Sequence, residues 1–306
     1  MTTGIQPQTM REVFGRTVTE LLDTDPRLVV VIADISAAML EPAAARHPNR
    51  VINVGIREQL LISTASGLAM TGLRPVVHTF SSFLVERPFE QIKLDLGHQD
   101  VGAVLVGAGG SYDMSAAGRS HQSPGDVAAL DTLPDWTVHV PGHPDEARRL
   151  LRAAIAGNDR VYLRLSDQSN TRPADGDRVR VIRPGRRGVV LAVGPMLDRV
   201  LAATATMDVA VAYTATVRPL DGLGLRAAVL SADRADVVLV EPYLAGTSAY
   251  LVNAALDDVP HRLRSLGVSR EFELRMYGTP ADHDEAHGLD TAGIAAAVRS
   301  FLDRTD

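Results

Sequence analysis

The chain of 306 residues carries a formal net charge of −6, with acidic and basic residues mixed along its length. A hydrophobic content of 45% is enough to build real cores, whereas 4% aromatic residues and an acidic balance argue against a nucleic-acid-binding surface. The absence of cysteine excludes disulfides, thiolate metal sites and a cysteine nucleophile. The polar N-terminus and the lack of an apolar run of about 20 residues predict neither a secretory signal nor a membrane span. We therefore expect a cytoplasmic protein.

Predicted helices and strands alternate along the first half of the chain. Apolar residues at helical spacing predict a helix over residues 9–22, and a β-branched run predicts a buried strand at residues 28–33. The sequence next predicts a strand from residue 51 and a helix that begins at Arg57. The remaining predicted strands are 74–80, 101–106, 136–140 and 161–165, and the remaining predicted helices are 83–97, one that ends at residue 130, and 144–156. Such alternation predicts a parallel sheet with helices on both faces.

The pattern changes at residues 173–187, which are rich in Pro, Gly, Asp and Arg and predict a linker with a solvated basic face. Alternation then resumes, with strands at 188–193, 209–213, 237–241 and 262–267 and helices from 196, at 245–256 and at 291–302. The predicted fold class is α/β with two doubly wound domains. The first, residues 1–172, has a mostly parallel sheet, and the second, residues 188–306, is smaller.

Two acidic residues stand where ligands are commonly bound in α/β proteins. Glu58 lies in the first turn of a predicted helix, after a short strand and Gly55. Helix N-termini favour negative charge, so Glu58 can be a capping residue or a catalytic acid. Asp34 follows the strand at 28–33, and the carboxyl ends of parallel strands bind ligands. Helix capping or an interface role is the alternative for Asp34.

Four motifs fall near predicted strand ends of the first domain: Gly55-Ile-Arg-Glu-Gln59, Thr79-Phe-Ser-Ser-Phe83, the glycine-rich loop 107–111, and Ser120-His-Gln122. In order and spacing they resemble the C-terminal half of transketolases and, more broadly, the pyrimidine-binding half of thiamine-diphosphate enzymes. Arg218-Pro-Leu-Asp221 and His287-Gly-Leu-Asp290 extend the resemblance over essentially the whole chain. It implies a pyrimidine-binding domain at 1–172 and a transketolase C-terminal-like domain at 188–306.

The resemblance also implies roles for individual side chains. Glu58 would hydrogen-bond ring atom N1′ of thiamine diphosphate and favour the tautomer whose amino nitrogen takes the C2 proton. Phe80 and Phe83 would pack on the aminopyrimidine, and Ile56 could line the same pocket, with ordinary core packing as the alternative for these three. His121 would face the substrate and handle protons or hydroxyl groups, the alternative being an ordinary surface histidine.

Three positions depart from the transketolase pattern. Gly109 stands where a His-Asp pair usually opens the glycine loop, and Ala117 stands where an Asp is usual. Asp167 replaces an Arg that binds the sugar phosphate, and an acid repels a phosphate. The cofactor-activating residues are thus retained, whereas the contacts to a phosphorylated sugar are largely missing. Arg164, with Arg119 and Arg87, is a candidate substrate contact from another direction.

In the transketolase family, the diphosphate and Mg²⁺ are bound by a Gly-Asp-Gly motif that is followed later by an Asn. No predicted strand–helix junction of this sequence carries that motif. Asp175-Gly-Asp177 lies in the predicted linker. We therefore expect no metal site on this chain. The resemblance implies a split enzyme in which an N-terminal transketolase subunit binds the diphosphate and Mg²⁺, assembled as an α2β2 heterotetramer. The chain alone should then have little or no activity.

The function implied by the resemblance is transfer of a two-carbon ketol unit from a ketose donor to an acceptor, as in carbohydrate metabolism. One alternative is the β subunit of a 2-oxo-acid dehydrogenase or a deoxyxylulose-phosphate-synthase-like subunit. Another is a non-catalytic scaffold partner, against which the presence of Glu58 and Phe83 argues. The sequence names neither the donor nor the acceptor.

Overall fold

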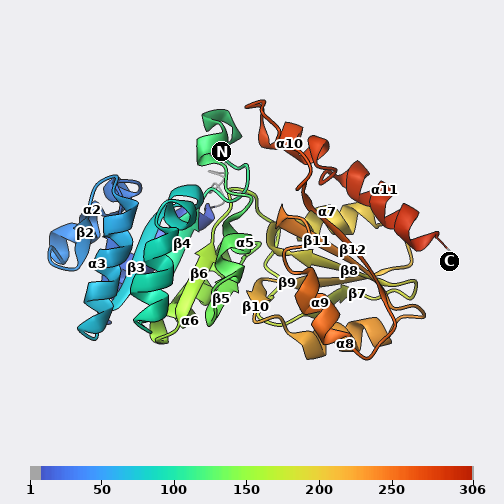
Figure 1. Cartoon of the computed structure of the whole chain (residues 1–306), viewed down its shortest axis with the longest axis horizontal. Helices are drawn as coiled ribbons and strands as arrows, with labels where there is room; N and C mark the ends of the chain where they lie inside the picture. Colours follow the sequence, from blue (N-terminus) through green and yellow to red (C-terminus); the bar gives the residue numbers. More distant parts are fainter. Residues whose placement is uncertain (1–7, 305–306) are drawn as a thin grey trace, which may run out of the picture.

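The computed structural model describes residues 8–304, which form two sheets, each covered by helices on both faces (Figure 1). The first sheet has seven strands in the order β10-β5-β6-β4-β3-β1-β2. Its strands are β1 (Leu28–Ile32), β2 (Val51–Asn53), β3 (Arg74–Phe80), β4 (Val104–Ala108), β5 (Trp136–His139), β6 (Arg160–Arg164) and β10 (Thr216–Arg218). Neighbouring strands are parallel except β10, which runs antiparallel to β5.

Alternating side chains of the buried strands divide the core of this sheet into two layers. Val30 and Val76 pack in one cluster with Phe14, whereas Val31 and Val77 pack in another with Leu61. One face is covered by α1 (Met10–Leu22), α2 (Ala37–Arg46) and α6 (Pro144–Ala156), and the other by α3 (Glu58–Met70), α4 (Phe89–Gln91), α5 (Asp126–Asp131) and the π-helical segments Ser82–Glu86 and Ile92–His98.

The second sheet has five strands in the order β12-β11-β8-β9-β7, and all but the antiparallel edge strand β7 are parallel. Its strands are β7 (Arg180–Arg183), β8 (Val189–Val193), β9 (Ala210–Thr214), β11 (Asp236–Leu244) and β12 (Arg262–Val268). One face packs against α7 (Leu197–Ala203) and α11 (Thr291–Leu302), and the other against α8 (Gly222–Leu230) and α9 (Ala249–Ala255). Helix α10 (Pro280–Ala286) extends toward the loops of the first sheet (Figure 1).

This architecture confirms the predicted fold class, and β3, α6 and α11 have the predicted bounds. The expected helix at 83–97 is instead broken into π-helical and α-helical pieces around Pro88, which lacks a backbone N–H. The positions of two edge strands differ from the expected division into two domains and a linker. Strand β7 lies within the expected linker 173–187, and β10 comes from the second half of the chain but completes the first sheet.

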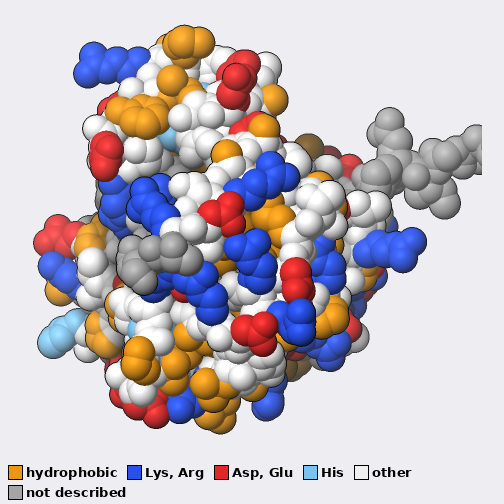
Figure 2. Space-filling model, turned by 90° about the vertical axis from the view of Figure 1, so that its right-hand side faces the viewer, with side chains coloured by type: hydrophobic (Ala, Val, Ile, Leu, Met, Phe, Trp, Pro, Cys, Tyr) orange, Lys and Arg blue, Asp and Glu red, His pale blue; other side chains and the backbone are white. Residues whose placement is uncertain are grey.

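The end of the molecule formed by the second sheet carries mixed charge. Figure 2 shows Lys and Arg side chains across the middle of this face, with Asp and Glu among them. Arg186 pairs with Asp208 at 3.5 Å and Arg187 with Asp303 at 2.8 Å. These exposed pairs support a solvated role for the arginine-rich stretch. Within residues 8–304, no helix has both the length and the apolarity to cross a lipid bilayer.

Candidate active site

The carboxyl ends of four neighbouring strands, β2, β1, β3 and β4, meet at one edge of the first sheet. Asp34 follows β1, Gly55 follows β2, Phe80 ends β3 and Gly109 follows β4. Open α/β sheets bind ligands at this edge, because the loops that leave adjacent strands meet there. The structure therefore brings the segments identified in the sequence to one place in the fold.

Glu58 is the first residue of α3, after a turn in which Gly55 has a φ of +71°. Its side chain is only 4% exposed, and Arg87 Nη1 donates a hydrogen bond to Glu58 Oε2 at 3.2 Å. Burying a carboxylate is costly unless hydrogen bonds or opposite charge compensate, and here the helix N-terminus and Arg87 do so. The buried negative charge at the start of α3 is thus balanced by the helix N-terminus and by Arg87.

Three rings, those of Phe80, Phe83 and His121, form an aromatic cluster that Arg87 connects to this carboxylate. The ring centroids of Phe80 and Phe83 are 5.9 Å apart, and the His121 ring lies 4.9 Å from Phe83 and 5.8 Å from Phe80, all edge to face. The Arg87 guanidinium lies 3.6 Å from the centroid of Phe83. Arg87 therefore links Glu58 to the aromatic cluster.

A second arginine, Arg11 of α1, also reaches this cluster. Its guanidinium carbon is 5.9 Å from the Phe80 centroid, and its Nε donates to Ser36 Oγ at 3.0 Å. Burial lowers the pKa of His78 to about 3, so this imidazole is neutral. Since His78 Nδ1 donates to a backbone carbonyl, its Nε2 accepts from Ser36 at 2.9 Å. The helical pattern of α1 gave no sign that Arg11 would reach this site.

Two further predicted site residues lie on the exposed rim. The Ile56 side chain is 69% exposed next to Glu58, so it does not pack in the core. Asp34 is exposed with a φ of +66°, a conformation that Asp tolerates better than most residues. Asn53 Nδ2 donates to Asp34 Oδ1 at 3.0 Å, and this bond fixes the carboxylate at the end of β1.

Arg164, in contrast, lies in the protein interior. Its side chain is 1% exposed, and its guanidinium donates to Asp126 Oδ2 and to Ser111 Oγ, both at 2.7 Å, and to Ser123 O at 3.2 Å. The guanidinium is therefore already hydrogen-bonded to groups in the protein interior. The geometry favours a structural role for Arg164 over the substrate contact expected from the sequence.

An acidic pair occupies the place where the family resemblance implies a phosphate-binding arginine. The backbone N–H of Asp167 donates to Asp113 Oδ2 at 2.9 Å. Burial raises the pKa of Asp113 to about 6 and also raises that of Asp167. The positive charge of Arg11 acts in the opposite direction and lowers the pKa of Asp167.

Within the described part of the chain, no group of three or more His, Asp or Glu side chains is arranged to hold a metal ion. The polar groups nearest the aromatic rings include the carboxylate of Glu58, the guanidinium groups of Arg87 and Arg11, and the imidazole of His121. Such a set can bind a planar, partly polar ring and exchange protons with it.

Comparisons with known proteins agree with this geometry. Residues 6–172, more than half of the chain, match the family model described as the pyrimidine-binding domain of transketolase. The chain belongs to the transketolase family. This transketolase-family chain is 58% identical to an uncharacterized 33.6 kDa protein in the fasciation locus of Rhodococcoides fascians, over 94% of this chain and 93% of that protein.

Longer relatives and a solved structure extend the match. The 1-deoxy-D-xylulose-5-phosphate synthase of Alkalilimnicola ehrlichii is 33% identical over 95% of this transketolase-family chain, which spans 48% of the synthase. The chain thus has about half the length of the synthases it matches. A solved structure described as a split gene transketolase, inactive beta4 tetramer, has a TM-score of 0.83 and 25% identity, over 97% of this chain and 98% of that one. The resemblance to the transketolase family is confirmed.

Proposed function

We propose that this chain is the pyrimidine-binding subunit of a split, thiamine-diphosphate-dependent enzyme that transfers a two-carbon ketol unit from a ketose donor to an acceptor. The observation that carries the proposal is the buried carboxylate of Glu58, joined through Arg87 to the rings of Phe80 and Phe83. A fixed carboxylate and aromatic faces fit the hydrogen-bonding edge and the flat faces of an aminopyrimidine.

In this proposal the bound cofactor supplies a carbanion-like nucleophile, which the protein itself cannot provide. Glu58 would hold a proton between its carboxylate and ring atom N1′ of the bound cofactor. Phe80 and Phe83 bind the ring and exclude water from it, with the exposed Ile56 at the rim. His121, whose ring lies against both phenylalanines, holds or moves a proton at a substrate hydroxyl.

The diphosphate and Mg²⁺ are proposed to be bound by a separate N-terminal transketolase subunit, in an α2β2 heterotetramer. Two observations support a partner chain. The synthases that match this chain are about twice its length. The split-gene transketolase matches it from end to end. A cytoplasmic location is proposed from membership of the transketolase family.

A deoxyxylulose-phosphate-synthase-like reaction is the second candidate, favoured by the 33% identity to such a synthase. Both candidates use the same cofactor-binding residues and differ in the substrates. The acids Asp113 and Asp167 repel phosphate, so we propose that the donor is an unphosphorylated ketose or a related neutral compound.

The test is co-purification of this chain with a diphosphate-binding subunit encoded beside it, followed by turnover of phosphorylated and free ketoses with and without thiamine diphosphate. Replacing Glu58 by Gln should lower turnover by about 100-fold or more while the circular dichroism spectrum is unchanged. Glu41→Gln changes an exposed acid on α2 and is the matched control. Wild-type turnover by the Glu58 variant would refute the proposal, as would cofactor-independent activity.

A further inference from the structure

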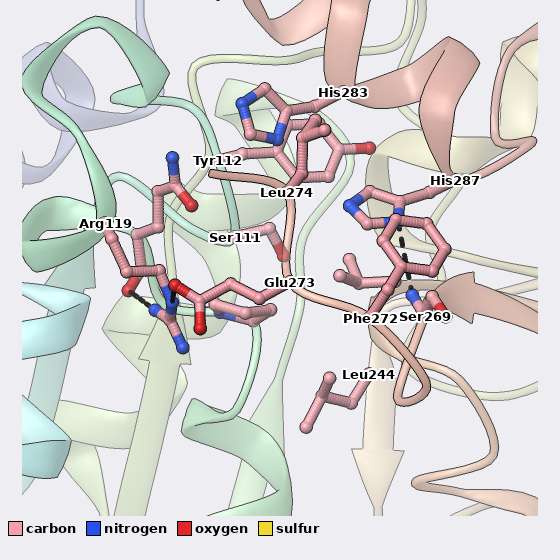
Figure 3. Close-up of a pocket in the computed structure, with 13 residues that line it drawn as sticks. Ser111, Tyr112, Arg119, Leu244, Ser269, Phe272, Glu273, Leu274, His283 and His287 are labelled. Atoms are coloured by element: carbon pink, nitrogen blue, oxygen red, sulfur yellow. Dashed lines mark hydrogen bonds and ion pairs between the residues drawn. The ribbon is translucent and has the colours of Figure 1, made fainter. Parts of the chain in front are cut away.

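A segment of the second domain, residues 269–279 between β12 and α10, reaches the loop of the first domain that carries His121. Figure 3 shows Glu273 of this segment pointing toward Arg119, two residues before His121. Glu273 Oε1 lies 3.5 Å from Arg119 Nε, with both side chains about half exposed. Exposed pairs of this kind stabilise weakly, so the ion pair guides the segment but does not hold it alone.

The closer contact is made by Tyr277, whose ring lies against the backbone of Gly118. A Cβ added at position 118 would lie 2.9 Å from Tyr277 Cε1 and 3.0 Å from Cζ, so the ring packs directly on this part of the backbone. Gly118 has a φ of +79°, a conformation that favours glycine. The carbonyl of Gly118 accepts a hydrogen bond from the backbone N–H of His121 at 3.0 Å. Tyr277 therefore packs on the turn that sets the position of His121.

The backbone of Tyr277 is bound by helix α10, which in turn packs on the first domain. His283 of α10 is buried, and its Nε2 donates to the carbonyl of Tyr277 at 2.9 Å. The His283 ring stacks on Tyr112 of the first domain at 5.0 Å, and Tyr112 donates its hydroxyl to Asp284 at 2.5 Å. These contacts fix the backbone of Tyr277 relative to the loop beneath it.

The cavity between the segment and the loop is small. It encloses about 100 Å³ and is lined by Tyr112, Arg119, Gln122 and His287 among other residues (Figure 3). Neither Tyr277 nor Gly118 is among the residues that line it, so their contact is separate from this cavity.

We propose that Tyr277 is a positioning residue for His121: its ring holds the turn 118–121 so that the imidazole lies against Phe80 and Phe83. The proposal rests on the role proposed for His121. It gives the second domain a part in the reaction, because a side chain outside the first domain sets the geometry of a group in the active site.

The first test measures backbone hydrogen exchange by mass spectrometry on the full chain, without any substrate. Tyr277→Ala should raise the exchange rate at residues 115–122 about tenfold and leave β3 unchanged. Tyr277→Phe keeps the ring and should behave as wild type. Leu223→Ala, at an apolar side chain of α8 that is 83% exposed, is the matched control. Unchanged exchange at 115–122 in Tyr277→Ala would overturn the proposal, as would an increase throughout the chain.

The second test measures kinetics in the complex with the diphosphate-binding subunit. Tyr277→Ala should lower kcat about tenfold and should shift the limb of the pH profile that is lost in His121→Gln. Its affinity for the cofactor should stay within about twofold of the wild-type value, because Glu58 and Phe83 stay in place. Tyr277→Phe should restore both. An unchanged pH profile and kcat would refute the positioning role. A wild-type complex without turnover would instead refute the proposed function, and the exchange measurement would then decide the role of Tyr277.

Discussion

Replacing Asp126 by Asn should destabilise the first domain by about 3–5 kcal/mol, the usual cost of leaving one partner of a buried ion pair uncompensated. The carboxylate of Asp126 is 0% exposed and Arg164 is 1% exposed. Oδ2 accepts hydrogen bonds from Arg164 Nε and Tyr162 Oη, both at 2.7 Å, and Oδ1 accepts from the backbone N–H of Val127 at 2.8 Å. Asn keeps the shape but removes the charge, so the variant isolates the electrostatic part.

The single tryptophan, Trp136, lies in β5 of the same sheet and is buried, so its fluorescence reports unfolding of this domain in urea. Asp258→Asn is the matched control, because its solvent-exposed pair with Arg226 should contribute far less to stability than the buried pair does. A loss below about 1 kcal/mol for Asp126→Asn would refute the reasoning, since it would mean that the buried guanidinium finds other partners.

Two further predictions concern Arg87 and Glu241. Arg87 covers the Phe83 face and bonds to Glu58, the two surfaces proposed for the aminopyrimidine, so Arg87→Met removes a competitor. Calorimetry on the assembled complex should show that the Arg87→Met variant binds thiamine diphosphate about fivefold more tightly than the wild type does. This corresponds to about 1 kcal/mol, which allows for the partial solvent exposure of Arg87. Weaker binding by the variant would contradict this prediction. Burial raises the pKa of Glu241 from 4.5 to about 7, so the native state binds its proton more tightly than the unfolded state, and stability falls as pH rises between these values. From pH 5 to pH 8 the wild type should therefore lose up to about 3 kcal/mol relative to Glu241→Gln in urea titrations, and parallel pH curves would contradict this.

Local sequence patterns predicted the elements that are regular and buried. Helix α6 begins at Pro144 and has apolar residues at helical spacing, and β3 contains the β-branched residues Val76, Val77 and Thr79, so both bounds could be read from the sequence. Gly55 before Glu58 likewise indicated a turn into a helix with an acid at its start. In each case the information lies within neighbouring residues.

The remaining features depend on contacts between distant parts of the chain. An arginine at a strand end has the same appearance in the sequence whether it binds a substrate or pairs internally, and only the position of Asp126 distinguishes the two for Arg164. The same holds for Arg11 and Arg87 beside the phenylalanines. Edge strands such as β7 have exposed side chains, so they lack the apolar pattern of buried strands.

Strand β10 has a consequence for how the chain can be divided. It belongs by sequence to the second half, yet its backbone pairs with β5, and Arg218 donates hydrogen bonds to the carbonyls of Leu130 and Leu133 in the first half. A fragment that ended at residue 172 would leave the outer edge of β5 open, and open edges invite pairing between molecules. We expect such a fragment to aggregate, and we expect the two halves to unfold together as one cooperative unit.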